Sequence, residues 1–277
     1  MAKLYVVGTP IGNLSDMSKR ALETLKNADF IAAEDTRVTL KLLNKFEIKN
    51  SLVSYHEHNR GTAGEQIANR ILAGENCALV TDAGMPAISD PGEELIKLCR
   101  EKGIEVESVP GPTAFATAAA ISGMSSARFT FEGFLSVTKR NRKEHLESLK
   151  DEERTMIFYE APHKLIYTLK DMLQMFGDRE IAICRELTKI HEEVINTTLS
   201  GAVEKYSNEA PKGEFVLVIR GKEKSAEKEY TFSQAVEIAK DYHKNGEPLS
   251  AAAKHAASET GYKKSDIYKE LCKWKEQ

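Results

Sequence analysis

Long hydrophobic runs are missing from this 277-residue sequence, and no apolar stretch approaches the roughly 20 residues that cross a bilayer. A signal-peptide pattern is missing too, because a strand-like run starts at Leu4, directly behind the N-terminus. These absences disfavour both a membrane protein and a secreted one. We therefore expect a cytoplasmic protein without a membrane partner.

Paired or clustered cysteines are also missing. The four cysteines lie far apart, and none belongs to a CxxC pair or a Cys/His cluster: Cys77, Cys99, Cys184 and Cys272. This spacing supports neither a zinc site nor a disulfide framework. We expect no metal, and a reducing compartment.

Strong charge of either sign is absent. The net charge of −3 argues mildly against a surface coated in nucleic acid, because phosphate binding depends on Lys and Arg, although a local basic strip remains compatible with it. The glycine fingerprint GxGxxG is absent as well, which disfavours a nicotinamide oxidoreductase. What the sequence does contain is 41% hydrophobic residues, enough to bury a sizeable core.

The first 120 residues alternate between strand-like and helix-like segments. Met17, Ala21 and Leu25 share one helical face, for example, and short apolar runs flank such segments. These runs predict strands at Leu4–Val7, Phe30–Ala33, Leu52–Tyr55, Ala78–Thr81 and Val106–Val109. The alternation predicts an α/β fold with a parallel N-terminal sheet and crossover helices.

A second α/β unit begins after Gly123, with a helix over Lys164–Met175. We expect a mixed sheet in which Glu193–Thr198 and Phe215–Ile219 form an antiparallel edge. The other predicted strands of this sheet are Phe129–Leu135, Met156–Tyr159 and Ile181–Cys184.

The C-terminal segment differs in character from both α/β units. Gly221–Glu229 is charged and is typical of a linker. Behind it lie two helical stretches with a break near Asn245-Gly246 and a third that starts near Ser265. This pattern predicts a small helical, helix-turn-helix-like module. The expected domains are residues 1–122, 123–222 and 230–277.

Three glycine- and proline-containing loops follow strands of the first unit, at the edge where ligands bind in parallel sheets. Gly8–Asn13 permits tight turns and a close backbone approach to a ligand, although an ordinary strand-to-helix turn is the alternative. Asp82–Gly92 is long for a strand-to-helix connection of about 2–6 residues and favours a binding role. Pro110–Ala114 opens an alanine-rich helix that Thr113 is expected to cap, and a plain helix start explains it equally well.

Charged residues lie at strand ends of both units. Glu34 falls where a dinucleotide fold places a ribose-binding carboxylate. In the second unit, Glu160, Arg185, Glu186 and Lys189 are placed to meet, either as a functional polar network or as a structural salt-bridge cluster.

Two segments are candidates for RNA contact. His56 lies two residues from His58, but no third metal ligand is evident, so a loop that touches RNA is favoured over a metal site. The basic run contributes four cations that suit phosphate binding, although a solvated helix face is the alternative: Lys139, Arg140, Arg142 and Lys143.

At these loops the sequence resembles the tetrapyrrole methylase superfamily of S-adenosylmethionine (SAM)-dependent enzymes. Within it, the resemblance is to the branch that methylates a cytidine 2′-hydroxyl in small-subunit (16S) ribosomal RNA. Tetrapyrrole-acting members carry a Gly-Gly-Asp-Pro-like second loop, where this chain has Asp82-Ala83-Gly84-Met85-Pro86. The matching stretches run in order through the chain: Leu4–Asp16, Ala32–Leu43, Ser54–Asn59, Val80–Gly92, Val109–Ala114, Phe131–Leu135, Phe158–Lys164, Cys184–Glu193 and Lys212–Ile219.

The resemblance implies two α/β domains, a homodimer, and SAM bound in the cleft between the domains. Its expected RNA partner is small-subunit ribosomal RNA or the assembled small subunit. The residues that it implies for cofactor binding are Pro10, Asp82, Ala83, Gly84, Ile88, Thr113, Ala114, Tyr159 and Leu187.

Methyl transfer to a ribose hydroxyl needs positioning and, for a neutral hydroxyl, a general base. Glu160, Glu186, Lys189 and His56 are the candidates, and Lys189 suits either a neutral base or a charged group that stabilises an alkoxide. Two alternatives remain. One is a SAM-dependent methylase of a tetrapyrrole precursor or a protein side chain, and the other is a non-catalytic RNA-binding protein of ribosome assembly.

Overall fold

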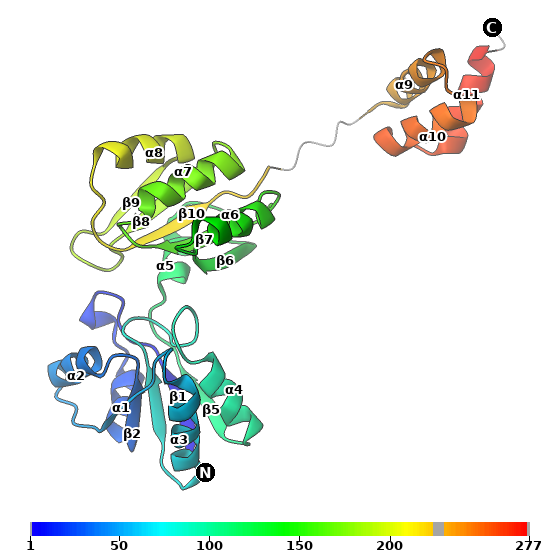
Figure 1. The fold of residues 1–277 in the computed structure, drawn as a ribbon. Coiled ribbons are helices and arrows are strands. Elements are labelled where there is room, and N and C mark those ends of the chain that lie inside the picture. The colour runs from blue at the N-terminus through cyan, green and yellow to red at the C-terminus, as the bar shows by residue number, and fades with distance from the viewer. Residues whose placement is uncertain (1, 224–229, 276–277) are drawn as a thin grey trace. The chain divides into compact units, whose positions relative to one another are not determined.

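The computed structural model describes residues 2–223 and 230–275 of the chain. The chain forms two compact units, Met1–Lys222 and Glu223–Gln277. In Figure 1 the first is coloured from blue through yellow and the second from orange to red. None of the described helices combines the length and hydrophobicity that a bilayer crossing requires.

The first sheet of the larger unit is parallel, as predicted, with the strand order β3-β2-β4-β1-β5. Its central strands are buried on both faces, as expected where helices cover both sides of a parallel sheet. The strands are β1 (Lys3–Val7), β2 (Phe30–Ala33), β3 (Leu52–Ser54), β4 (Cys77–Val80) and β5 (Glu105–Val109).

Helices cover both faces of this sheet. Helices α3 and α4 enclose one apolar cluster, and α1 and α2 enclose the other, into which Met17, Ala21 and Leu25 project as their spacing predicts. Ser18 caps α1 by accepting a hydrogen bond from the Ala21 amide at 3.1 Å. The helices are α1 (Lys19–Asn27), α2 (Thr36–Lys45), α3 (Arg60–Leu72) and α4 (Glu93–Glu101), with a 3-10 turn at Leu14–Asp16.

The second sheet is mixed, with the order β6-β7-β10-β8-β9. The predicted pairing of the last two strands is wrong, because β9 pairs with β8, and β10 lies between β7 and β8. The reason is burial: all five residues of β10 are buried, which suits a central strand. The strands are β6 (Phe129–Phe134), β7 (Thr155–Glu160), β8 (Glu180–Arg185), β9 (Glu193–Thr198) and β10 (Phe215–Ile219).

The two faces of the second sheet are covered unequally. Three helices pack on one face, and α5 covers part of the other, as Figure 1 shows. Helix α5 begins directly after the third glycine-containing loop, so it joins that loop to the second sheet. The helices are α5 (Ala114–Ile121), α6 (Lys139–Ser148), α7 (Leu165–Phe176) and α8 (Leu199–Asn208).

The smaller unit is a three-helix module with an alanine-rich core of its own. Its helices are α9 (Phe232–Lys244), α10 (Leu249–Thr260) and α11 (Lys264–Lys275), and they break where the sequence predicts. A capping box between Thr231 and Gln234 starts α9, and Gly261 ends α10 in the left-handed conformation. The predicted linker falls largely on residues 224–229, which lie outside the described residues.

Candidate functional site

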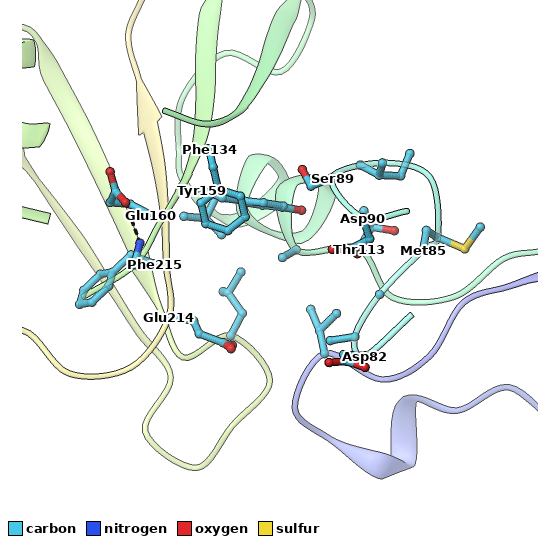
Figure 2. Close-up of a pocket in the computed structure, with 18 of the residues that line it drawn as sticks. Asp82, Met85, Ser89, Asp90, Thr113, Phe134, Tyr159, Glu160, Glu214 and Phe215 are labelled. Carbon is cyan, nitrogen blue, oxygen red and sulfur yellow. Dashed lines mark hydrogen bonds between the residues drawn. The ribbon is translucent and has the colours of Figure 1, made fainter. Parts of the chain in front are cut away.

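A cavity of about 550 Å³ lies within the larger unit and draws its walls from both sheets. One wall consists of loops at the carboxyl edge of the parallel sheet, including Asp82–Met85, Ile88–Asp90 and Thr113. The other wall consists of the end of β7, Leu187 and the start of β10 (Figure 2). The volume falls in the range of about 300–1,000 Å³ that is usual for small-molecule sites.

Backbone contacts hold together the three glycine-containing loops, which contribute Ile11, Gly84 and Thr113 to the floor of this cavity. Thr9 and Gly84 exchange two backbone hydrogen bonds, with N–O distances of 2.9 and 3.1 Å. Gly8 lies so close to Gly111 that a Cβ on either residue would come within 3 Å of the other's backbone. These two glycines thus let the loops pack on each other, whereas the sequence suggested only a close approach of backbone to ligand.

The carboxylates of Glu34, Asp82 and Asp90 line the same cavity. Burial is the main cause that raises the pKa of each, and for all three the charge of a neighbouring carboxylate adds to the increase. Neighbouring Asp35, by contrast, caps α2 and pairs with Arg37 at 2.6 Å. The cavity therefore presents concentrated negative charge, which suits a cationic ligand.

Tyr159 joins the two walls of the cavity. Its hydroxyl accepts a hydrogen bond from the Phe115 amide at 3.0 Å, so β7 holds the first turn of α5. Its ring packs edge-on against Phe131 and Phe134, as Figure 2 shows for Phe134. Burial raises the pKa of Tyr159, which keeps the hydroxyl neutral. Thr113 takes the N-cap position of α5, but the predicted side-chain cap is absent, because its hydroxyl donates to the Gly111 carbonyl.

Leu187 enters the cavity from a loop with unusual backbone geometry. The residues on either side of it, Glu186 and Thr188, have positive φ angles of 51° and 65°. Such conformations cost about 1–3 kcal/mol each and persist only where contacts enforce them. Here the Glu186 carboxylate accepts hydrogen bonds from the Glu214 amide at 3.0 Å and from Lys189 Nζ at 2.8 Å.

Three of the four predicted candidates for the general base, Glu160, Glu186 and Lys189, are engaged with other protein groups. Both carboxylate oxygens of buried Glu160 accept hydrogen bonds, from the Ala161 amide at 2.8 Å and the Thr168 hydroxyl at 2.5 Å. Burial lowers the pKa of Lys189, but hydrogen bonds to Glu186 and Glu214 outweigh it, so the net pKa is raised and the ammonium stays charged. The hydrogen bond from Lys189 lowers the pKa of Glu186. These contacts leave Lys189 unsuited to act as a neutral base.

Eight of the nine predicted cofactor-binding residues line the cavity, and only Pro10 lies outside it, against a second, smaller cavity. The predicted RNA-binding residues lie away from its lining. Arg142 is largely buried and pairs with Asp171 at 2.8 Å, and Arg140 pairs with Glu144 at 2.8 Å. His56 keeps a buried Nδ1 without a hydrogen-bond partner among the described residues. Among those residues, no group of three His, Cys, Asp or Glu side chains could hold a metal ion.

Several lining residues were not predicted as part of the site. Four of them lie inside loops that the sequence singled out, and Phe134 lies near the end of the predicted strand Phe129–Leu135, so these positions carried a signal: Ile11, Met85, Ser89 and Asp90. The others come from segments that only the tertiary fold brings here: Ala161, Pro162, His163, Glu214, Phe215 and Val216.

The chain's relatives agree with this geometry. The tetrapyrrole (corrin/porphyrin) methylase family matches residues 3–203. The solved structure of a uroporphyrin-III C-methyl transferase from Thermus thermophilus, complexed with S-adenyl homocysteine, shares the fold with a TM-score of 0.56 at 17% identity, over 78% of this chain and 97% of that one. The chain therefore belongs to the tetrapyrrole methylase family, which confirms the predicted fold class and the prediction of a SAM-dependent methyltransferase.

The curated relatives point to one branch of that family. A ribosomal RNA small subunit methyltransferase I from Halalkalibacterium halodurans is 47% identical over 268 residues, which cover 96% of this chain and 93% of that protein. A protein of the same name from Thermotoga maritima is 48% identical over 223 residues, which cover 80% of this chain and 100% of that protein. The resemblance drawn from the sequence is thereby confirmed.

Proposed function

We propose that this protein transfers the methyl group of SAM to a cytidine 2′-hydroxyl in small-subunit ribosomal RNA. The observation that carries the proposal is the carboxylate-lined cavity of about 550 Å³, built on loops of a chain whose near full-length relatives are named for small-subunit ribosomal RNA. The names of these relatives favour RNA over a tetrapyrrole as acceptor. Membership in a methylase family, together with the cavity, favours an enzyme over a non-catalytic assembly protein.

The residues of the cavity fit SAM by their chemistry. Bound SAM supplies an electrophilic methyl group on a positively charged sulfonium. Glu34, Asp82 and Asp90 provide negative charge for a cation of this kind, and Leu187 and Ile88 provide apolar surface. The backbone floor around Gly84 fixes the cavity before binding, so positioning costs little conformational entropy.

A transfer assay with SAM labelled on its methyl group tests the proposal. The acceptors are naked small-subunit RNA, small ribosomal subunits from a strain that lacks this enzyme, and a tetrapyrrole precursor. We expect label in a single cytidine ribose of the RNA or the subunit. Label in the tetrapyrrole alone would contradict the proposed acceptor, and failure to bind SAM by calorimetry would contradict an enzymatic role altogether.

The proposal extends to partners and compartment. A ribosomal acceptor is found in the cytoplasm, and we propose that the enzyme works there as a homodimer, which sedimentation would reveal as twice the chain mass of 30.8 kDa. We propose that Lys139 and Lys143, at the start of α6, bind RNA phosphates together with Arg140 and with His56 of the loop after β3. Arg142, held by Asp171, orients this helix.

The cavity carboxylates give donor binding a pH dependence. The pKa values of Glu34, Asp82 and Asp90 are raised, so these groups gain protons at a higher pH than ordinary carboxyls, whose pKa is about 4. Protonation removes their attraction for the sulfonium of SAM but not for the neutral thioether of S-adenosylhomocysteine. We expect the preference for SAM over S-adenosylhomocysteine to fall roughly 10-fold as the pH drops from neutral to the ordinary carboxyl pKa of about 4.

Calorimetric titrations of both ligands at several pH values measure that preference. The direction of these pKa shifts also predicts an effect on the stability of the fold. Because folding raises these pKa values, the ligand-free protein loses stability as the pH rises through them, and bound SAM offsets the loss. A preference that stays constant over this pH range would show that the carboxylates do not face the sulfonium.

The helical tail should be dispensable for donor binding. It forms a compact unit with its own core, and the Thermotoga maritima relative aligns over its whole length to 80% of this chain. A chain truncated after Lys222 should therefore bind SAM with an affinity within about 2-fold of the full-length value. Calorimetry on both chains measures this, and a large loss of affinity would mean that the tail completes the site.

A further inference from the structure

A second cavity of about 350 Å³ lies beside the first in the larger unit. It is bounded by the loop after β1, through Pro10 and Leu14, and by one face of α2. Asp82 lines both cavities, so a single carboxylate stands where the two meet.

The α2 wall of the second cavity combines apolar and cationic side chains. Val38, Lys41, Leu42 and Lys45 line it with the spacing of one helical face. Val38 and, across from it, Leu14 remain 37% and 40% exposed, although apolar side chains of this size are usually better covered. This wall suits a ligand that has an apolar face and carries negative charge.

The two lysines are available to such a ligand. Lys41 and Lys45 lie one turn apart, both are exposed, and neither forms an ion pair with any described residue. Arg37, one turn earlier, differs because two of its nitrogens bond the Asp35 carboxylate at 2.6 and 3.0 Å. The free positive charge on α2 is therefore concentrated beside the cavity, as phosphate binding requires.

Asp82 is better placed to accept a proton than the predicted catalytic residues. Its Oδ1 accepts a hydrogen bond from the Asp35 amide at 3.2 Å, and its Oδ2 has no hydrogen-bond partner among the described residues. Its charged neighbours are Glu34, Asp35, Asp90 and Arg37, and burial, the largest effect, raises its pKa. Figure 2 shows it low on the wall formed by the first sheet, across the cavity from Glu214.

We propose that the second cavity binds the acceptor nucleotide, that Lys41 and Lys45 bind its flanking phosphates, and that Asp82 Oδ2 accepts the proton of the acceptor hydroxyl. This assignment rests on the proposed RNA methylation. It gives Asp82 a catalytic role between the two cavities, whereas the family resemblance implied only cofactor binding for this residue.

The step balances with the groups named. The O–H bond of the ribose breaks and its proton passes to Asp82, while an oxygen electron pair forms the bond to the methyl carbon. The carbon–sulfur bond breaks, and its electron pair stays on sulfur. Asp82 then releases the proton to water, and the products are a methylated ribose and a neutral thioether.

The Asp82→Asn variant tests the catalytic role. With small ribosomal subunits from a strain that lacks the enzyme, we expect kcat at saturating SAM to fall about 100-fold, as for loss of a general base. The wild-type rate should rise with pH through the raised pKa of Asp82, and the variant should lose that rise. The affinity for SAM should fall no more than about 3-fold, because Asp82 is one of three carboxylates that attract the sulfonium. A larger loss of SAM affinity with normal kcat would limit Asp82 to donor binding and overturn its role as base.

The double variant Lys41→Gln/Lys45→Gln tests the acceptor cavity. We expect KM for the same subunits to rise at least about 10-fold, and the slope of log affinity against log salt to fall by about 2, one for each lost phosphate contact. SAM affinity should not change. The matched control is Lys26→Gln/Lys97→Gln, which removes two exposed lysines that line neither cavity and should behave as wild type.

The outcomes separate this inference from the proposed function. If the wild-type enzyme methylates no RNA, the proposed function fails. If the wild type methylates the subunits and the α2 double variant matches the lysine control in KM and salt slope, the acceptor binds elsewhere and this inference alone fails. Thermal unfolding of each variant confirms that the folded protein is compared.

Discussion

Replacement of Gly111 by Ala should reduce SAM affinity at least about 100-fold, the equivalent of roughly 3 kcal/mol. A Cβ at this position would lie 2.9 Å from the Cα, carbonyl carbon and carbonyl oxygen of Gly8. These are backbone atoms, so no side-chain rotation relieves the overlap. The loops after β1 and β5 would have to separate, and with them Ile11 and Thr113, which line the cavity.

The control for this prediction is Gly61→Ala in the first turn of α3. A Cβ there meets no atom within 4 Å, so that variant should bind SAM as the wild type does and be equally or more stable. Calorimetric titration with SAM, after circular dichroism has confirmed the fold, measures the difference. A folded Gly111→Ala protein with normal SAM affinity would mean that the packed loops do not form the floor of the donor site.

The position of the site was predictable because topology decides it. Short buried runs such as Phe30–Ala33 predict parallel strands, and the loops after parallel strands meet at one edge. The composition of Asp82–Gly92 then distinguished a binding loop from a connection. Hence eight of the nine residues implied for cofactor binding line one cavity. Pro10 lines the neighbouring cavity instead, although the next residue, Ile11, lines the first.

The partners of individual charged residues were not predictable, since they depend on contacts between distant segments. Lys189 bonds not only nearby Glu186 but also Glu214, which lies 25 residues away, and both contacts raise the pKa of the ammonium. Arg142 belongs to a basic run that predicts a phosphate site, yet it forms an ion pair with Asp171 of α7. For the same reason the pairing of β9 was misassigned: its apolar pattern shows a strand but does not name the neighbour.

Two neighbouring substitutions on β7 should have opposite consequences, because successive strand residues face opposite sides of a sheet. Phe158 is fully buried in the cluster under α6, α7 and α8, and Tyr159 faces the donor cavity. Phe158→Ala should lower the free energy of unfolding by about 3–5 kcal/mol, a large share of the usual 5–15 kcal/mol for a protein of this kind. SAM affinity of the folded fraction should be nearly normal, since the cavity wall is unchanged.

Tyr159→Phe should instead weaken donor binding with only a small loss of stability. It keeps the ring and its packing on Phe131 but removes the acceptor for the Phe115 amide, a net loss of about 0.5–1.5 kcal/mol. Because that hydrogen bond holds the start of α5, where Thr113 and Ala114 line the cavity, we expect SAM affinity to fall roughly 10-fold. Urea unfolding and calorimetry on both variants measure the two effects. If Tyr159→Phe left SAM affinity intact, the hydroxyl would serve only to stabilise the second sheet, and the link between the walls would not matter for the donor.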